Sequence, residues 1–201
     1  MSSDERPIVL NTGCGALGTG QLPRMFSNWR QVRVDVDPSV APDVLADIVD
    51  LAPIAAASVD AVWTAHCMEH LYEHDVARAM TEIRRVLKPD AFACIVVPDL
   101  QRIAAFIAED RILETIYESP AGPITPHDVV YGFGAAIARG QVTMAHRCGF
   151  TPAALTRQIV KAGFGGYSLL RRAGFELAAV VRAEDWASPS ERDELLAKLG
   201  L

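Results

Sequence analysis

Short apolar runs alternate with polar segments along the first half of the chain. In QVRVDV (residues 31–36), valine occupies every second position, which predicts a strand with one buried face. Apolar runs at residues 8–10 and 59–64, and a weaker one at 44–48, predict three more strands. The stretch 91–97 is apolar throughout, as is typical of a strand buried on both faces of a parallel sheet.

Helical spacing appears between these runs. A helical stretch is predicted around residues 22–26, and a longer helix is predicted to be stopped by Pro89. The longer helix is indicated by apolar residues three or four positions apart: Val76, Met80, Ile83 and Leu87. Strands that alternate with helices predict an α/β fold, in which right-handed crossovers connect parallel strands.

The last third of the chain departs from this alternation. A helix is expected over residues 100–117. Residues 119–150 are rich in Gly and Pro, and we expect them to leave the sheet as a lid-like connection without regular structure. Thr151 is placed to cap the next helix, with Pro152 in its first turn and Gly163 beyond its end.

Two strands close the predicted sheet. Residues 167–170 and 175–181 are joined by so short a turn that they must pair antiparallel. A capping box at residues 188–191 then opens a last helix through Leu199. We therefore predict one domain over residues 1–201, built on a mostly parallel seven-stranded sheet whose last strand is antiparallel.

Composition and charge argue against two classes of partner, nucleic acids and membranes. Half of the 201 residues are hydrophobic and the net charge is -6, which argues against sequence-independent nucleic-acid binding because that needs basic surface. No apolar run is long enough to span a bilayer, and the first ten residues lack the apolar segment of a signal peptide. Four widely spaced cysteines with no Cys-x-x-Cys pair fit a reducing compartment. We expect a cytoplasmic protein without a nucleic-acid or membrane partner.

Residues 9–20, VLNTGCGALGTG, place four glycines directly after a predicted strand. Without Cβ atoms, such a loop lets the backbone approach a ligand closely. The spacing G-x-G-x-x-G from Gly13 to Gly18 also matches the fingerprint of nicotinamide-dinucleotide sites, with Asp35 as the acceptor for ribose hydroxyls. A tight turn without a ligand is the simplest alternative, but it leaves the entropic cost of four glycines unexplained.

Motifs further along the chain distinguish these alternatives. They are LNTGCG (10–15), VDVDP (34–38), ADI (46–48), SVDAV (58–62), HCMEHL (66–71), RRVLKP (84–89) and VPDL (97–100). Together they resemble the class I S-adenosylmethionine-dependent methyltransferases over residues 8–182. The resemblance implies a Rossmann-like fold, S-adenosyl-L-methionine as the cofactor and a sheet that closes with a reversed strand. Gly-Gly usually follows the Lys-Pro pair in this family, where this chain has Asp90.

The resemblance also implies which residues hold the cofactor. The methionine part is expected at the glycine loop near Asn11, the ribose at Asp35, and the adenine at Asp47 and the Ile48 backbone. His66 and Cys67 would line the methyl-donor end. The full expected set is Asn11, Gly13, Cys14, Gly15, Asp35, Asp47, Ile48, His66 and Cys67. For Asp37 and Asp50 we expect helix or turn capping instead.

Two overlapping H-x-x-E-H strings, at residues 66–70 and 70–74, match the inverted zinc-peptidase pattern. On one helix, residues four apart share a face and two imidazoles could bind zinc. However, His66 is expected at a strand end, and no third ligand follows in a helical segment. We therefore expect no metal, and we expect Glu69 and His70 to lie near the cofactor.

Methyl transfer asks mainly for placement, because the sulfonium donor is already activated. A hydroxyl acceptor would also need a general base, for which His66, His127 and His146 are candidates. Residues 130–151 resemble a substrate-covering element of a bacterial branch of the family that is thought to act on sugars and other small metabolites. Because residues 119–150 leave the alternating pattern, we expect them to cover the methyl-donor end with Tyr131 and His146 facing the acceptor, and an ordinary surface excursion is the alternative. We expect a methyltransferase for a hydroxyl of a small-molecule or glycan-type acceptor, with His146, His66 and Tyr131 as the catalytic candidates.

Two other functions stay open at this point. A nicotinamide-dependent oxidoreductase would share the glycine loop, although the chain has no Tyr-x-x-x-Lys string. A catalytically silent cofactor-binding protein would carry the same motifs, because the family has no universal catalytic residue. A nucleobase acceptor is disfavoured, since the chain has neither an Asn-Pro-Pro-Tyr-like string nor a Pro-Cys pair.

Overall fold

The computed structural model describes residues 5–18 and 22–201, so Gly20 of the glycine loop lies outside the described residues. Seven of the described strands form one sheet in the order β3-β2-β1-β4-β5-β9-β8. They are β1 (Ile8–Thr12), β2 (Arg30–Asp35), β3 (Val44–Leu45), β4 (Val59–Ala65), β5 (Leu87–Pro98), β8 (Gly166–Arg172) and β9 (Glu176–Arg182). Neighbouring strands are parallel, except that β9 is antiparallel to both β5 and β8. The predicted fold class is confirmed.

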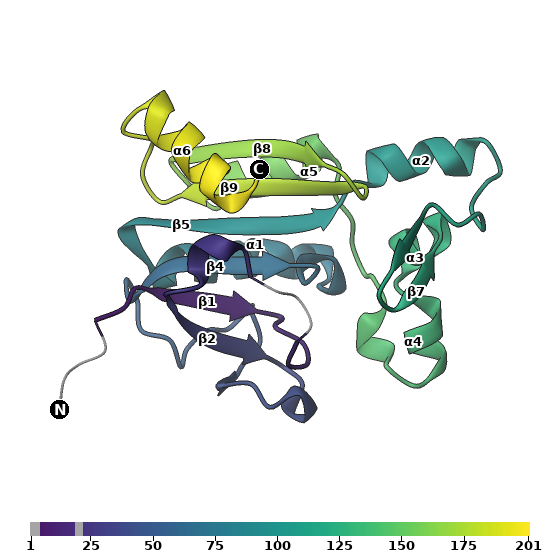
Figure 1. Cartoon of the computed structure of the whole chain (residues 1–201), viewed down its shortest axis with the longest axis horizontal. Helices are drawn as coiled ribbons and strands as arrows, with labels where there is room; N and C mark the ends of the chain where they lie inside the picture. Colours follow the sequence, from purple (N-terminus) through teal and green to yellow (C-terminus); the bar gives the residue numbers. More distant parts are fainter. Residues whose placement is uncertain (1–4, 19–21) are drawn as a thin grey trace.

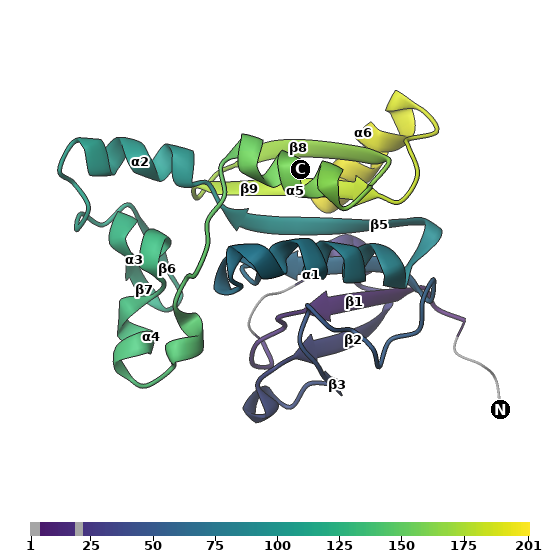
Figure 2. The same ribbon diagram turned by 180° about the vertical axis from the view of Figure 1, so that it is seen from behind.

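Helices cover both faces of this sheet (Figures 1 and 2). On one face lie α1 (Glu73–Val86) and α5 (Pro152–Lys161), and on the other lie α6 (Pro189–Leu199) and the short helix η1 (Arg24–Phe26). The helical stretch predicted at 22–26 is therefore a single 3-10 turn. No helix of the described residues is both long and apolar enough to cross a membrane.

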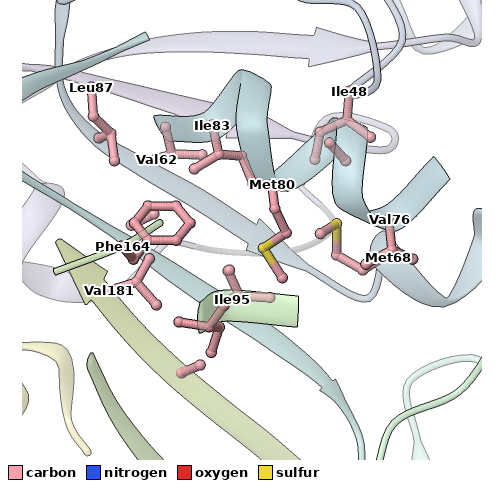
Figure 3. Close-up of a cluster of buried hydrophobic side chains, with 14 of the residues drawn as sticks. Ile48, Val62, Met68, Val76, Met80, Ile83, Leu87, Ile95, Phe164 and Val181 are labelled. Atoms are coloured by element: carbon pink, nitrogen blue, oxygen red, sulfur yellow. The ribbon is translucent and has the colours of Figure 1, made fainter. Parts of the chain in front are cut away.

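Helix α1 forms because its apolar residues share one face. The buried residues of this stripe are Val76, Ala79, Met80, Ile83 and Val86. Acidic residues in the first turn and arginines in the last turn match the helix dipole. Figure 3 shows Met80 among core side chains that the sheet contributes. Met80 is fully buried, so truncating it to alanine would cost about 2–5 kcal/mol.

The end of α1 differs from the prediction. Leu87 is the first residue of β5 instead of the last apolar residue of the helix, and Pro89 lies within that strand. The pairing of β4 with β5 shifts between Val59–Leu87 and Ala61–Phe92, so the intervening part of β5 bulges outward. Pro89 is exposed in this bulge, where its missing N–H breaks no ladder bond.

Between β5 and α5, the chain leaves the sheet and lies beyond the carboxyl ends of β1, β4 and β5 (Figures 1 and 2). Its elements are α2 (Leu100–Ala108), β6 (Tyr117–Ser119), β7 (Gly122–Ile124), α3 (Pro126–Tyr131), α4 (Gly134–Ala138) and η4 (Val142–Met144). The expectation that 119–150 leaves the sheet is confirmed. The expectation that it lacks regular structure is wrong, because β6 and β7 pair as a hairpin and Thr125 caps α3 with a complete capping box.

Helix α2 is also shorter than the predicted span of 100–117. It ends at Ala108, and Asp110 adopts a left-handed conformation with φ 59°, which a continuing helix does not allow. Beyond this point, Arg111 pairs with Glu109 and Glu114 in an exposed turn. Tyr117 belongs to the hairpin instead of the helix.

The predicted caps are present. The Thr151 side chain accepts from the Ala154 N–H at the start of α5, and Ser188 accepts from the Glu191 N–H at the start of α6. The Glu191 carboxylate accepts from the Ala187 N–H, one residue before the cap, instead of from the Ser188 N–H, so this capping box is altered. Asp37 caps the short helix η2 (Pro38–Val40), as expected. Asp50 likewise accepts from the Ala52 N–H in a turn.

Candidate functional site

The loop after β1 lies at the edge of the sheet where the parallel strands end. Gly13 and Gly15 adopt left-handed conformations, with φ 63° and 61°. A Cβ on Gly13 would lie 2.8 Å from both Cβ and Sγ of Cys67, the second residue after β4. Any side chain at position 13 would therefore be strained by the left-handed backbone and would also collide with Cys67.

Asp35, the last residue of β2, is joined to the glycine loop. Its Oδ2 accepts from the Gly15 N–H at 2.9 Å, and its Oδ1 accepts from the Asp37 N–H at 3.0 Å. Arg33 of the same strand donates to the Gly15 carbonyl at 2.7 Å. Cys14 is buried beside Asp35, and burial raises the pKa of its thiol. These contacts bring together the predicted residues of the first two strands.

The other expected cofactor residues extend this edge. Asn11 is buried within β1, two residues before the loop. Asp47 follows β3 with its side chain exposed, and it accepts from the Val49 N–H at 3.0 Å. Ile48 is buried and packs in the main core. The structure thus places Asn11, Asp35 and Asp47 at the ends of three adjacent strands.

A side-chain network holds the segment that follows Asp47. Glu82 of α1 accepts from the Leu51 N–H at 2.8 Å and from Arg85 at 2.7 Å. Arg85 in turn donates to the carbonyls of Leu51 and Ile54. The hydrogen bond from Arg85 is the main reason that the pKa of Glu82 lies below its ordinary value.

His66 follows β4 and connects two carboxylates. It has the left-handed φ of 52°, and its side chain is half-exposed. Its Nε2 lies 2.9 Å from Glu176 Oε1, and its Nδ1 lies 3.3 Å from Glu69 Oε1. Burial lowers the pKa of His66, but the hydrogen bonds to Glu176 and Glu69 outweigh that effect and raise the pKa to about 10. The imidazolium form has no free lone pair, so His66 does not suit the general-base role that the sequence offered.

Cys67 has a different character. Burial raises the pKa of its thiol to about 12, so Cys67 stays protonated at neutral pH. Its side chain instead fills the space beside Gly13. Its part in the site is therefore packing against the glycine loop.

A cavity of about 170 Å³ lies between the edge of the sheet and the segment that leaves it. Its lining combines apolar and aromatic side chains with imidazoles and carboxylates. The lining residues are His66, Glu69, His70, Pro98, Tyr117, Ile124, Asp128, Val129, Phe133, Met144, His146, Gly174, Phe175 and Glu176. The lining is mainly apolar and includes three histidines and three carboxylates, as in binding sites where a few polar groups orient the ligand.

His146 enters this cavity from the segment between β5 and α5. Its Nδ1 lies 2.8 Å from the Val129 carbonyl, which fixes the proton on Nδ1 and leaves the lone pair on Nε2. Burial lowers the pKa of His146 below its ordinary value, so the ring is neutral at pH 7. His146 and His70 stand edge to face, with ring centroids 4.9 Å apart.

Two of the residues expected near the acceptor lie elsewhere. Tyr131 is 55% exposed and packs on His127, with ring centroids 4.9 Å apart. Neither side chain is among the described residues that line the cavity. Only the backbone of Tyr131 takes part, because its carbonyl accepts from the His146 N–H.

Comparison with known proteins shows a similarity over the first half of the chain. Residues 10–95 match a family model described as a methyltransferase domain. None of the curated proteins compared with the chain matches it.

Solved structures share the fold at low sequence identity. A SAM-dependent methyltransferase from Methanosarcina mazei has a TM-score of 0.58 and 15% identity, over 92% of this chain and 95% of that one. A SAM-dependent methyltransferase from Archaeoglobus fulgidus has a TM-score of 0.56 and 12% identity, over 89% and 86%. A protein from Pyrococcus horikoshii OT3 has a TM-score of 0.57 and 13% identity, over 89% and 82%.

The family model covers residues 10–95, which is less than half of the chain, and the solved structures show that the fold is shared. The matched segment contains Asp35, Asp47 and His66, but it ends within β5. His146 and most of the cavity therefore lie outside the match, in the part of the chain that the family model does not cover.

Sequence reasoning missed several cavity residues. Tyr117 was expected in a helix, and Phe175 and Glu176 were expected only as strand residues. Glu176 reaches the cavity because it pairs with Pro98, the last residue of β5, in the register of β9. The antiparallel pairing could have indicated this position, since it brings the start of β9 to the end of β5 where ligands bind.

Proposed function

We propose that the protein is a methyltransferase that transfers the methyl group of S-adenosyl-L-methionine to a hydroxyl of a small-molecule or glycan-type acceptor. The cavity lined by His66, whose neighbour Cys67 contacts the glycine loop, is the observation that carries this proposal. It is small, and its lining combines imidazoles and carboxylates with aromatic rings. Such a lining suits one ring of a hydroxylated compound.

The proposed cofactor residues fit the chemistry of the cofactor. The Asp35 carboxylate, at the end of β2, offers acceptors for the two ribose hydroxyls. The exposed Asp47 offers acceptors for the adenine amino group. Gly13 and Gly15 leave the loop without side chains where the methionine part would pack. Asn11, Cys14, Ile48 and Cys67 complete the proposed site.

Contacts along the chain support a position of the acceptor next to the cofactor. Cys67 contacts the glycine loop, and its neighbour His66 lines the cavity. Two consecutive residues after β4 therefore connect the sites: Cys67 lies against the proposed cofactor loop, and His66 lies against the cavity. We propose that residues 119–150, which supply much of the far wall, act as a lid over the acceptor in a single domain.

S-adenosyl-L-methionine, held by these residues, would supply an activated methyl group for the acceptor oxygen, with S-adenosylhomocysteine as the leaving group. The residues of the chain hold the acceptor and receive its proton. The lone pair on His146 Nε2 is placed to take the hydroxyl proton. The carboxylates of Glu176 and Asp128 are available to accept from other hydroxyls of the acceptor.

Incubation of the protein with cofactor and a panel of acceptors would test this proposal. Monosaccharides, phenols and aliphatic alcohols form one set, and amines and thiols of matched size form the other. We expect S-adenosylhomocysteine and a methyl ether from the first set alone. Methylation confined to nitrogen, sulfur or carbon would contradict the hydroxyl acceptor while leaving the methyltransferase activity in place.

A further inference from the structure

Three potential metal ligands converge in the cavity from two distant parts of the sequence. Glu69 and His70 belong to the short helix η3 (Met68–His70) after β4, and His146 follows η4. One ligand atom from each residue lies within 4.8 Å of the other two. The two H-x-x-E-H strings at residues 66–74 had no third ligand nearby in the sequence. The fold supplies His146, which lies 76 residues after His70.

Both imidazoles are oriented by the backbone. His70 Nδ1 lies 3.2 Å from the Ala145 carbonyl, and His146 Nδ1 lies 2.8 Å from the Val129 carbonyl. Each ring therefore donates through Nδ1 and keeps its lone pair on Nε2. Histidines that ligate metals show this arrangement, because the carbonyl fixes the tautomer and the ring orientation.

Glu69 carries the independent observation. It is 1% exposed, and its Oε2 has no hydrogen-bond partner among the described residues. Its Oε1 is held by His66 Nδ1 at 3.3 Å. A buried carboxylate oxygen without a donor is costly unless a cation or another donor reaches it. Because Nδ1 of His70 and of His146 lies against a backbone carbonyl, Nε2 is the ring nitrogen that is left to ligate a cation.

The two ligand segments are fixed to each other. The Arg147 and Cys148 N–H groups donate to the Glu69 carbonyl at 2.8 and 3.2 Å, and Cys148 Sγ donates to the Met68 carbonyl at 3.3 Å. The backbones of η3 and of the chain after His146 therefore form one unit. The ligand atoms now lie within 4.8 Å of one another. Around a tetrahedral ion with ligands at about 2.1 Å, they would be about 3.5 Å apart. Rotation of the side chains must supply this difference.

We propose that Glu69, His70 and His146 bind one divalent transition-metal ion of the Zn²⁺ type. Two neutral imidazoles and one carboxylate are a donor set of catalytic zinc sites, which keep a fourth position open. His66 would hold the Glu69 carboxylate from outside, as second partners of metal ligands do. This proposal replaces the expectation, drawn from the sequence, that the protein binds no metal.

The catalytic part of this inference rests on the proposed function. The open position would face the cavity that receives the acceptor. A cation there would stabilise negative charge on the acceptor oxygen, so that the hydroxyl proton passes to solvent water while the C–O bond forms and the S–C electrons go to sulfur. His146 would then bind the ion instead of taking the proton. The binding of the ion itself does not depend on the acceptor.

Zinc titration of the full-length protein would test the site. The protein is first dialysed against a chelator, and Zn²⁺ is then added in competition with a chromophoric chelator. We expect one Zn²⁺ per chain with submicromolar affinity. We also expect a visible Co²⁺ spectrum of low-symmetry, four-coordinate type. His70→Ala, His146→Ala and Glu69→Gln should each weaken Zn²⁺ binding at least 100-fold.

Matched variants keep this experiment decisive. His74 and His127 are exposed histidines near the same elements, so His74→Ala and His127→Ala should bind Zn²⁺ like the parent. Cofactor affinity and the circular dichroism spectrum verify that each variant is folded. No binding below about 100 μM in the parent would overturn the proposal, as would stoichiometric binding that persists in His146→Ala or disappears on cysteine alkylation. Because these readouts involve no methyl transfer, failure of the metal site is distinguishable from failure of the proposed function.

Discussion

The carboxylate of Asp35 accepts a hydrogen bond from the backbone N–H of Gly15 at 2.9 Å. This bond joins the end of β2 to the loop after β1, although the two residues are 20 positions apart in the sequence. A ligand that contacts the loop therefore also meets a carboxylate whose position is fixed. The arrangement explains why the glycines and the acidic residue occur together.

Replacing Asp35 by Ala is expected to weaken cofactor binding. The loss of hydrogen bonds to a charged group should cost about 1.5–3 kcal/mol, or about 10- to 150-fold in affinity for S-adenosyl-L-methionine. Isothermal titration calorimetry measures this change, with Asp193→Ala, at an exposed position of α6, as the control. Unchanged affinity in Asp35→Ala would remove this carboxylate from the site.

Gly13→Ala should abolish cofactor binding more completely than a substitution at another glycine of the loop. The new Cβ would lie 2.8 Å from Cys67 and would also force a left-handed conformation on alanine. Gly18 has φ 85°, but no atom of the residues that the structure describes lies within 4 Å of the position that an added methyl group would take, so Gly18→Ala is expected to add mainly backbone strain. Equal cofactor affinity in the two variants would show that the contact with Cys67 does not shape the loop.

Glu82→Gln is expected to destabilise the fold in a pH-dependent way. The pKa of Glu82 lies below its ordinary value because Arg85 and the Leu51 N–H bind the carboxylate. A depressed pKa stabilises the folded state above the ordinary pKa, and this contribution is lost as the pH falls through the folded-state value. At pH 7 the variant should lose about 1–2 kcal/mol in urea unfolding.

The difference between parent and Glu82→Gln should shrink as the pH falls from 7 towards 3. Glu109→Gln serves as the control, because Glu109 lies in an exposed pair whose contribution is small. A constant difference across this range would mean that the ionised carboxylate is not the stabilising form.

His146→Ala should lower turnover at least tenfold, about 1.4 kcal/mol of barrier, with unchanged cofactor affinity. His146 lines the cavity and carries a free Nε2 lone pair, whereas the Tyr131 side chain is 55% exposed outside it. Tyr131→Phe should therefore turn over like the parent. The reverse result would place the acceptor on the outer face of α3.

Local patterns predicted much of the fold and the positions of the proposed cofactor residues. Valine alternation located β2, which ends at Asp35, and the loop glycines could be placed because they directly follow β1. Periodicity misled at Leu87, since an apolar residue that opens a buried strand continued the helical spacing of α1. An apolar residue at this position fits both a helix and a buried strand. Only the pairing of Leu87 with Val59 shows that it belongs to a strand.

The acceptor side could not be predicted in the same way. Glu176 faces His66 across 110 residues because β9 returns antiparallel to β5 and places it beside Pro98. His146 meets Glu69 because backbone bonds fix the two segments together. These contacts depend on how β5 and β9 pair and on how distant segments pack together. Residue spacing along the sequence does not predict either.

Calorimetric titration of the protein with S-adenosyl-L-methionine, S-adenosylhomocysteine and NADH tests the central claim most directly. We predict that both methionine-derived ligands bind with one site per chain and micromolar or tighter affinity, and that NADH gives no binding heat. Binding of NADH without binding of S-adenosyl-L-methionine would contradict the assignment as a methyltransferase.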